Sequence, residues 1–451
     1  MKKRYNWINT LTPVQLLILF YIIAVVFSTV LLSLPIAYKD NVSIPFIDIL
    51  FTAVSALSVT GLSTISIADT FNVTGIILLT VIMHLGAVGV MAISTLIWLV
   101  IGKKISLQER RLIMTDQNQT SFSGMVRLIK EIIILLLIVE LIASLVLGTY
   151  FLKYYTSIGE AYFNGYFKAI SAISNAGFDL TGNSMIPFKD DYFVQSIIMF
   201  LIIFGAIGFP VLIEVKEYLL RKKNNRRFMR FSLFVKVTSV TFFALIIVGA
   251  IGIYILDMRG FFVSTSWHEA FFYSLFQSVT TRSGGLSTMD VSMLTEANQL
   301  FISLLMFIGA SPSSAGGGIR TTTFALVILF VVTYFRGESR VHIFKREIHE
   351  EDLIKAVIVI LVAFSFMFAS VLVISIVEDF SLIQILFEVT SAFGTVGLSL
   401  GITDQLSTLS KFVLMFLMFI GRVGIVTFLF IFKSKKTKSN FQYPKEKIII
   451  G

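Results

Sequence analysis

The sequence predicts an all-α polytopic membrane protein with eight transmembrane helices and four re-entrant pore loops, arranged as four parallel span–loop–span repeats around a central pore. Composition is the first observation: 56% of the 451 residues are hydrophobic and only 14% are charged, whereas soluble domains carry about 25% charged residues. So few charges cannot cover a water-facing surface. The second observation is that long apolar runs alternate with shorter ones, and the third is a glycine motif that recurs four times.

Eight apolar runs are long enough to be spans, since a helix needs about 20 apolar residues to cross the hydrocarbon core. They are Leu16–Leu34, Val73–Ile101, Ile129–Leu152, Phe193–Ile213, Phe231–Leu256, Leu300–Phe335, Leu353–Val377 and Phe412–Phe432. The first run follows Lys2, Lys3 and Arg4, but it is too long for a signal-peptide core. We therefore expect it to be the first span. The absence of Cys excludes a disulfide scaffold.

The basic residues are sorted to one side of these spans. They concentrate in the N-terminal tail, in segments 102–130, 214–236 and 336–355, and in the C-terminal tail. The other side holds Lys39, Lys153, Lys168, Lys189, Arg259, Arg282 and Lys411, with acids that include Asp40, Asp69, Asp179, Asp190, Asp191, Asp290 and Glu296. The positive-inside rule predicts a multi-pass cell-membrane protein with both termini in the cytoplasm. The outer acids should concentrate cations at an external mouth.

The net charge of +10 therefore reflects orientation, and we expect no nucleic-acid partner. A surface for anionic membrane lipids or for a cytosolic partner is the expected second use of the basic segments.

A repeat links the paired spans. Four apolar stretches too short to cross lie between them: Pro45–Ile67, Glu160–Leu180, Trp267–Met289 and Leu382–Leu400. Each ends in a glycine followed by a bulky apolar residue, and these glycines, Gly61, Gly177, Gly285 and Gly397, are 116, 108 and 112 residues apart. Six residues before the glycine, Ser55, Ser171 and Ser391 match in three repeats. Residues 1–101, 102–228, 229–345 and 346–433 are therefore predicted as pore repeats 1 to 4, with a gate loop in the third, and residues 434–451 as a cytoplasmic tail.

The span after each loop carries a second glycine signal. It reads Gly86-x-x-Gly89, Gly205-x-x-Gly208 and Gly421-x-x-Gly424, with Gly309 in the third repeat. Small residues let helices pack closely in membranes, and we expect that role for Gly86, Gly89, Gly205 and Gly208. All four units enter the membrane from one side, so the repeats are parallel, which favours a central pathway.

The short loops suit an ion filter. Glycine permits positive φ and leaves backbone carbonyls free to face an axis, where rings of them replace an ion's hydration shell. The loops offer no charged ligands for a hard divalent ion, so a dehydrated monovalent cation is expected. The predicted filter residues are Val59, Thr60, Gly61, Asn175, Ala176, Gly177, Ser283, Gly284, Gly285, Thr395, Val396 and Gly397.

The sixth run is interrupted in a way that predicts a gate. The predicted gate loop is Ser311, Pro312, Ser313, Ser314, Ala315, Gly316, Gly317 and Gly318, and no other repeat has this break. Proline and a glycine triplet are unfavourable in a helix; a passive kink is the alternative.

Charged residues within the spans need partners. Arg422 lies mid-span, and we expect it to bind carbonyls of the gate loop, either as an electrostatic barrier or as a structural tether. Arg320 lies nearer the cytoplasm and is expected to snorkel. Glu140 needs a partner that the sequence does not name, and His84 is expected to pack or form a hydrogen bond rather than bind metal.

The loops Thr60-Gly61-Leu62, Asn175-Ala176-Gly177-Phe178 and Phe393-Gly394-Thr395-Val396-Gly397-Leu398 resemble the filter segments of the Trk/Ktr/HKT potassium transporters. The resemblance covers nearly the whole chain and is greatest to the membrane subunit of bacterial Ktr systems. It implies potassium uptake, often sodium-dependent, through a pseudo-fourfold pore within one chain. A homodimer in a bacterial cell membrane, with a cytosolic ring of nucleotide-binding Ktr regulatory subunits, is also implied.

In that family, glycine at all four filter positions goes with potassium, and the loop at Ser311–Gly318 is the gate, with a barrier role for Arg422. The third loop, Arg282-Ser283-Gly284-Gly285-Leu286, departs from the usual Arg-Thr-Ala-Gly-Phe. We expect potassium to be the substrate, no cofactor in this chain, and nucleotide only on the regulatory partner.

The sequence gives less support to two other classes of function. A coupled cation and solute symporter should show inverted repeats and a polar substrate pocket, and neither is visible. A membrane enzyme should show paired carboxylates or histidines within spans, where only Glu140 and His84 qualify. We therefore predict a transporter with no catalytic residues.

Overall fold

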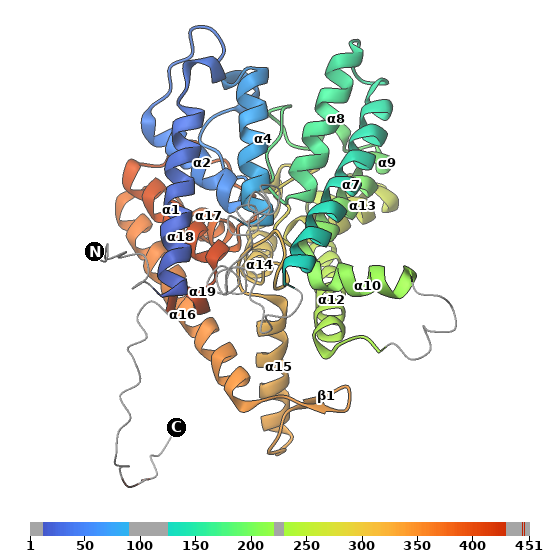
Figure 1. The fold of residues 1–451 in the computed structure, drawn as a ribbon, viewed down its shortest axis with the longest axis vertical. Coiled ribbons are helices and arrows are strands. Elements are labelled where there is room, and N and C mark those ends of the chain that lie inside the picture. The colour runs from blue at the N-terminus through green and yellow to red at the C-terminus, as the bar shows by residue number, and fades with distance from the viewer. Residues whose placement is uncertain (1–11, 90–124, 221–229, 430–443, 445, 447–451) are drawn as a thin grey trace, which may run out of the picture.

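The computed structural model describes residues 12–89, 125–220, 230–429, 444 and 446. The predicted tails, residues 90–101 of the second span, residues 430–432 of the eighth and part of the basic segments lie outside this range. The described chain is helical apart from one short antiparallel hairpin, in which β1 (His342–Ile343) pairs with β2 (Arg346–Glu347) (Figure 1).

The helices fall into four successive groups of the same plan: a long helix, a short helix, a loop and a second helix. The first group comprises α1 (Pro13–Leu32), η2 (Pro35–Ala37), α2 (Phe46–Ser58), α3 (Ile67–Thr70) and α4 (Val73–Val88). The second comprises α7 (Met125–Phe151), α8 (Ile158–Ile173), η3 (Ile186–Phe188), α9 (Tyr192–Ala206) and α10 (Phe209–Leu220).

The third group comprises α12 (Leu233–Leu256), η4 (Phe261–Ser264), α13 (Trp267–Thr280), η5 (Val291–Met293), α14 (Glu296–Phe307) and α15 (Thr321–Phe335). The fourth comprises α16 (Glu350–Val377), α17 (Leu382–Gly394), η6 (Thr403–Gln405), α18 (Thr408–Val423) and α19 (Ile425–Leu429). Polar caps start several of these helices: Ser266 with Glu269 and Ser381 with Gln384 form capping boxes before α13 and α17.

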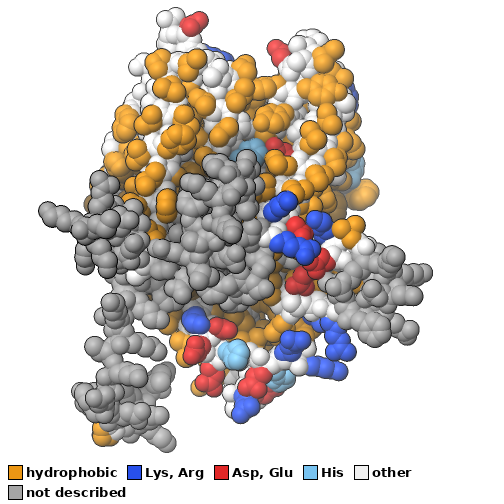
Figure 2. Space-filling view, viewed as in Figure 1, with side chains coloured by type: hydrophobic (Ala, Val, Ile, Leu, Met, Phe, Trp, Pro, Cys, Tyr) orange, Lys and Arg blue, Asp and Glu red, His pale blue; other side chains and the backbone are white. Residues whose placement is uncertain are grey.

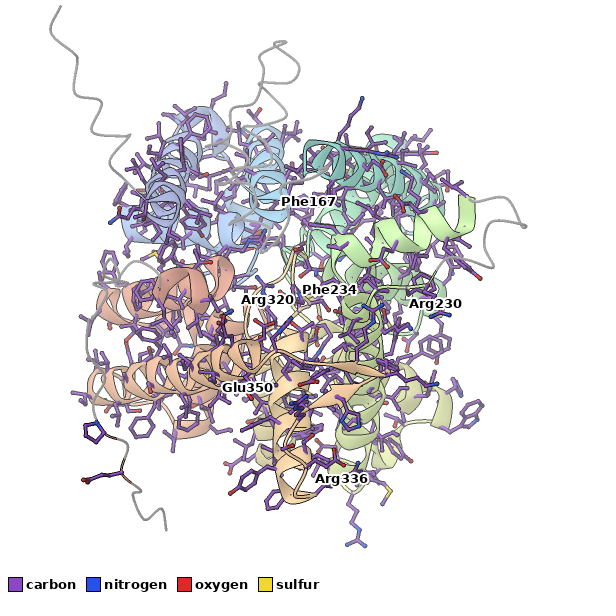
Figure 3. All side chains as sticks on the ribbon, turned by 60° about the horizontal axis from the view of Figure 1, so that its bottom comes forward. Phe167, Arg230, Phe234, Arg320, Arg336 and Glu350 are labelled. Atoms are coloured by element: carbon purple, nitrogen blue, oxygen red, sulfur yellow. The ribbon has the colours of Figure 1, made fainter. Side chains whose placement is uncertain are left out.

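The four groups surround a common centre (Figure 3). The second helix of each group packs against the short helix of the next: α4 on α8, α9 on α13, α14 on α17, and α18 back on α2. This cyclic packing closes a ring in chain order, so the second and fourth groups lie across the ring from each other. We call α2, α8, α13 and α17 the pore helices.

The long helices form the outside of the ring. Within the described residues, α1, α7, α12 and α16 are the helices long and apolar enough to cross a membrane, and the bent pair α9 and α10 adds a fifth if it counts as one span. Their outward side chains are apolar and exposed, as for Phe27, Leu141, Ile247 and Phe364. On the face shown in Figure 2, hydrophobic side chains gather over the upper part, and charged ones gather toward the end that carries α10 and the hairpin.

The second helices differ from the prediction of continuous spans. They are 16, 15, 12 and 16 residues long in α4, α9, α14 and α18. Gly89, Gly208 and Gly424 stop three of them, with φ of +94°, +101° and +90°. The run Phe193–Ile213 is therefore not one continuous helix: the chain bends by 105° between α9 and α10, because Gly208 is left-handed and a new helix starts at Phe209.

The interruption predicted in the sixth run is present. Helix α14 ends at Phe307 and α15 begins at Thr321, with irregular backbone between them.

One ion pair joins the first and last groups. Lys411 of α18 lies 2.7 Å from Asp48 of α2, and each residue is 8% exposed. The sequence assigned Lys411 to the outer side of the spans without indicating its burial or its partner.

Asp48→Ala should destabilise the protein by about 3–5 kcal/mol, because it leaves the Lys411 ammonium buried without its partner. Thermal unfolding of the purified protein in detergent measures this. The double variant Asp48→Leu with Lys411→Met removes both charges and should recover most of the loss. Equal stability of Asp48→Ala and the parent protein would contradict a structural role for the pair.

Candidate ion filter and gate

The four loops after the pore helices share one backbone conformation. The residue two before each glycine is left-handed, with φ of 59° at Val59, 57° at Asn175, 78° at Ser283 and 48° at Thr395. The glycines follow with φ of 90°, 69°, 72° and 95° in chain order. In a regular strand successive residues alternate in direction. Two left-handed residues, two positions apart, break that alternation. Backbone carbonyl oxygens of each loop can therefore point to the same side.

The four glycines meet at the centre of the ring. A Cβ built on Gly61 would lie 2.5 Å from Ala176 O, and one on Gly177 would lie 2.9 Å from Gly285 Cα. One on Gly285 would lie 2.5 Å from Val396 O, and one on Gly397 would lie 2.1 Å from Thr60 O. Real Cβ atoms do not come this close to backbone, so each loop contacts the next only because its tip carries no side chain.

Hydroxyl groups of the pore helices hold these loops from behind. Ser55 Oγ accepts from Gly61 N at 3.1 Å, and Ser391 Oγ accepts from Gly397 N at 3.0 Å. Ser171 Oγ donates to Phe178 O at 2.5 Å. In the third repeat, Thr280 Oγ1 donates to Leu286 O at 2.6 Å. The serines that recur six residues before the glycine are therefore loop anchors.

The second glycine signal has two roles. The first glycine of each motif packs against the end of the preceding pore helix: a Cβ on Gly86 would lie 2.3 Å from Leu57 O, and one on Gly205 would lie 2.2 Å from Ile173 O. This agrees with the expected close packing. Gly89 and Gly208 instead end their helices, which corrects the packing role expected for them.

The predicted gate loop lies against the filter loops. A Cβ on Gly316 would lie 2.5 Å from the Ser283 side chain, and one on Gly317 would lie 2.6 Å from the Thr395 side chain. Backbone bonds tie the loop to the break between α9 and α10, where Ser311 N donates to Ala206 O at 3.0 Å.

Further backbone bonds complete this attachment. Phe209 N donates to Ser313 O at 2.8 Å, and Ala315 N donates to Gly205 O at 3.0 Å. On the other side, Gly318 N donates to Gly421 O at 3.2 Å. The loop therefore bridges the second, third and fourth groups.

Two guanidinium groups bind the gate loop. Arg422 donates to the carbonyls of Ser314 (3.3 Å), Ala315 and Gly316 (3.4 Å), and also to those of Gly86 and Ala87 (3.1 Å). This matches the partners expected for it. Arg320 donates to Ser311 O (3.4 Å) and Gly316 O and lies near the centre of Figure 3. Arg320 was expected to snorkel; instead its guanidinium binds carbonyls that the gate loop leaves free.

Glu140 has a partner that the sequence did not name. His84 Nε2 lies 2.9 Å from Glu140 Oε2, and His84 Nδ1 lies 2.8 Å from Thr80 O. The two residues are 56 positions apart and lie on α4 and α7. His84 therefore forms the hydrogen bonds expected of it.

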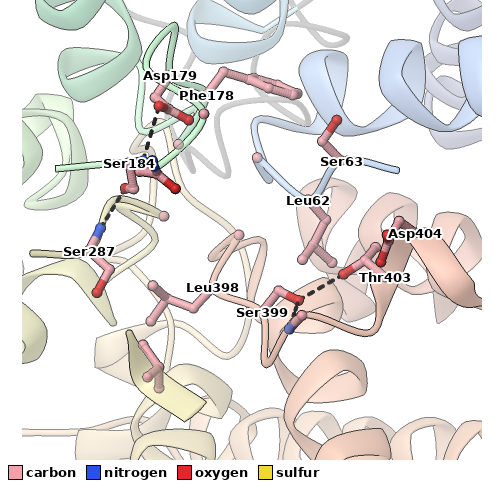
Figure 4. A pocket seen from close by; sticks show the side chains of 18 of the residues that line it. Leu62, Ser63, Phe178, Asp179, Ser184, Ser287, Leu398, Ser399, Thr403 and Asp404 are labelled. Carbon is pink, nitrogen blue, oxygen red and sulfur yellow. Dashed lines mark hydrogen bonds between the residues drawn. The ribbon is translucent and has the colours of Figure 1, made fainter. Parts of the chain in front are cut away.

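A cavity of about 620 Å³ opens above the filter glycines and is lined by all four of them (Figure 4). We call it the vestibule. Asp179, Asp290 and Asp404 line it, together with hydroxyls such as Ser399 and Thr403. Two of these acids were predicted to gather cations at a mouth. Asp179 Oδ2 accepts from Thr181 and Ser184, which fixes the turn that carries it.

Three buried charges near the ring were not recognised from the sequence. Lys168 and Arg282 were counted among the bases of the outer side, and they are 2% and 0% exposed. Glu388 is 1% exposed. Arg282 donates to Ile308 O at 2.5 Å and Leu305 O at 2.6 Å, at the carbonyl end of α14. The sequence signal that could have indicated their burial is a charged residue within an otherwise apolar pore helix or at its end.

The structure is a ring of four glycine-tipped loops surrounded by apolar helices. This arrangement defines the class of protein as a membrane protein that transports an ion. The family model for TrkH, described as "Cation transport protein", matches residues 4–443. The chain belongs to this family of cation transport proteins, and it is not an enzyme.

Its relatives are named as potassium transporters. The chain is 54% identical to Ktr system potassium uptake protein D of Bacillus subtilis, with 98% of each chain covered. It is 36% identical to Ktr system potassium uptake protein B of the same organism, with 100% of this chain and 99% of the relative covered. It is 32% identical to potassium/sodium uptake protein NtpJ of Enterococcus hirae, with 100% and 99% covered.

A solved structure shares the fold. The crystal structure of the potassium transporter TrkH from Vibrio parahaemolyticus matches with a TM-score of 0.69 at 20% identity, covering 92% of this chain and 84% of that one.

Gly421→Ala should destabilise the fold by about 1–3 kcal/mol or more, because its Cβ would lie 1.9 Å from Phe393 O, at the end of a pore helix. Thermal unfolding in detergent tests this. Gly159→Ala is the matched control, since its Cβ would meet Ser157 Oγ at 3.7 Å, and it should be neutral or stabilising by about 0.5–1 kcal/mol. Equal stability of the two variants would show that the predicted close packing is not required.

Proposed function

We propose that this chain takes up potassium across the cell membrane by conducting the dehydrated ion through the ring of filter loops. The ring of four left-handed, glycine-tipped loops is the observation that carries this proposal. Backbone oxygens of Thr60, Ala176, Gly284 and Val396 and their neighbours would replace the ion's water. The names of the relatives support potassium as the substrate.

Electrostatics around the ring favour a monovalent cation. The pore helices direct their C-terminal, partly negative ends toward the loops, and the vestibule carries three aspartates. Neutral carbonyl oxygens suit a weakly hydrated alkali ion better than Mg²⁺ or Ca²⁺, which prefer carboxylate ligands. A membrane potential of 100 mV would supply about 2.3 kcal/mol per unit charge toward uptake.

The gate loop would close the pathway on the side of the filter away from the vestibule. It contacts Ser283 and Thr395, and it is held there by Arg320 and Arg422. Two positive charges at this point also form an electrostatic barrier to a cation. Release of the loop would remove both the steric block and part of that barrier.

The membrane arrangement follows from this function. The vestibule would face outward and both termini would lie in the cytoplasm, with eight membrane crossings in which the second helix of each repeat is short or broken. The Ktr system names of the relatives support a regulatory partner. In this proposal that partner would be cytosolic and would carry the nucleotide, and two copies of this chain would form a homodimer surrounded by lipid. The name of NtpJ supports a role for sodium.

Rubidium and sodium uptake into proteoliposomes that hold the purified chain tests the function directly. We expect rubidium uptake that excess potassium inhibits by competition and that excess sodium does not inhibit. Sodium uptake equal to rubidium uptake, or no uptake above empty vesicles, would contradict it.

Gly285→Ser should lower selectivity for potassium over sodium by about tenfold, equivalent to about 1.4 kcal/mol. Gly285 has φ of +72° and its Cβ would lie 2.5 Å from Val396 O, so a side chain must move the carbonyl ring. The competition assay above measures the change. Gly337→Ser is the control, because Gly337 is also left-handed but has open space around it and does not line the vestibule, and the selectivity of this variant should match the parent protein. Unchanged selectivity in Gly285→Ser would count against the filter.

Deletion of residues 313–317 should raise basal rubidium flux. The increase should be about tenfold if the loop holds the closed form by about 1.4 kcal/mol. Flux is measured without any cytosolic partner. Deletion of residues 342–346, an equally long part of the exposed hairpin, should leave basal flux unchanged. Flux at or below the parent level after removal of 313–317 would exclude the gate role.

A further inference from the structure

The internal repeat places opposite charges at equivalent positions behind the filter. Nine residues before each filter glycine, the pore helices carry Thr52, Lys168, Phe276 and Glu388. All four are buried, with exposures of 0%, 2%, 0% and 1%. Lys168 lies on α8 of the second group and Glu388 on α17 of the fourth. Because the groups close a ring in chain order, these two charges lie on opposite sides of the filter.

Lys168 braces one side of the vestibule. Its Nζ donates to Ser184 O at 3.0 Å and lies 5.2 Å from the centre of the Phe188 ring. Ser184 belongs to the turn that Asp179 holds, and its Oγ accepts from Ser287 N at 2.8 Å (Figure 4). The lysine thus connects the middle of a pore helix to the vestibule segments of the second and third repeats.

Glu388 braces the opposite side in the same way. Its Oε1 accepts from Ser399 Oγ at 2.5 Å and Leu400 N at 3.1 Å, and its Oε2 accepts from Thr403 Oγ1 at 2.9 Å. The two hydroxyl oxygens, Ser399 Oγ and Thr403 Oγ1, lie 3.0 Å apart (Figure 4). An ionised carboxylate accepts hydrogen bonds only, and these three groups can all donate. Both charges therefore reach from a pore helix past the filter loop to the vestibule wall.

A buried charge beside an ion pathway acts on the ion, because little water screens it. Lys168 by itself would oppose entry of a cation, whereas Glu388 by itself would hold the cation. Conduction needs binding strong enough to admit the ion and weak enough to release it. Arg282 is the further buried cation near the loops, and it binds the carbonyl end of α14, where the helix dipole offsets its charge.

We infer that Lys168 and Glu388 are paired positioning residues that brace opposite walls of the vestibule and exert opposing fields on the ion that enters the filter. This inference rests on the proposed function, since it requires that a cation passes through the ring. The equivalent residues Thr52 and Phe276 are uncharged, so the pair acts along one diagonal of the ring.

The test is rubidium uptake into proteoliposomes as a function of external rubidium, which separates apparent KM from maximal rate. Lys168→Gln should lower KM and Glu388→Gln should raise it, each by a factor on the order of three to ten. The double variant should return KM to within about twofold of the parent protein, because the two fields cancel again. Lys189→Gln, which removes an exposed charge from the same segment, should leave KM unchanged.

A purely structural role predicts a different pattern. In that case both single variants would shift KM in the same direction or not at all, and the double variant would be worse than either, which would overturn the inference. Lys168→Met with Glu388→Leu removes both charges together, and its melting temperature is measured alongside to show that the variant still folds. A KM near the parent value supports charge balance, and a shift of tenfold or more in this variant overturns it.

The two proposals fail in distinguishable ways. A parent protein that takes up no rubidium would overturn the proposed function together with this inference. A parent protein that conducts, with KM unmoved in all the charge variants, would overturn this inference alone.

Discussion

The close approach of four backbone loops is the constraint on which the rest of the structure depends. At Gly61, Gly177, Gly285 and Gly397 a single methyl group would overlap the neighbouring loop, and all four glycines have positive φ. Four loops with unused backbone oxygens would repel one another at this distance unless something held them. Hydroxyls of the pore helices, and the packing of each second helix onto the next pore helix, supply that support.

The third repeat departs from the fourfold plan at its second helix, which is where a gate would have to contact the pathway. Its second helix opens into the gate loop, which hydrogen-bonds to the ends of α9 and α18 and is bound by Arg320 and Arg422. The other three second helices break at a left-handed glycine instead. Fourfold packing therefore builds the ring, and one departure from it places a polar segment against Ser283 and Thr395.

Much of this architecture is readable in the sequence because the chain repeats itself. A glycine recurring at intervals of 116, 108 and 112 residues locates every loop of the ring, and Pro312 with the triplet Gly316 to Gly318 locates the break in the sixth run. The helix ends at Gly89, Gly208 and Gly424 were missed. The motif Gly-x-x-Gly is compatible both with close helix packing and with a left-handed residue that ends a helix. The sequence also stays apolar on both sides of each helix end, so hydropathy does not mark it.

Buried charges were the other failure, and the reason is physical. Counting Lys and Arg for orientation assigns each residue to one side of the membrane and gives no sign of burial, so the burial of Lys168, Arg282 and Lys411 was not predicted. Their burial depends on partners far away in the sequence, such as Asp48 for Lys411, 363 positions apart. The partner of Glu140 was hidden for the same reason, since His84 lies on a different repeat.

The most direct test of the central claim is the position of a heavy alkali-like ion in the protein itself. Crystals grown with thallium(I) in place of potassium should show anomalous density on the ring axis, between the backbone oxygens of Thr60, Ala176, Gly284 and Val396. Anomalous density confined to the vestibule carboxylates of Asp179, Asp290 and Asp404, with none at the ring, would contradict coordination by the main chain.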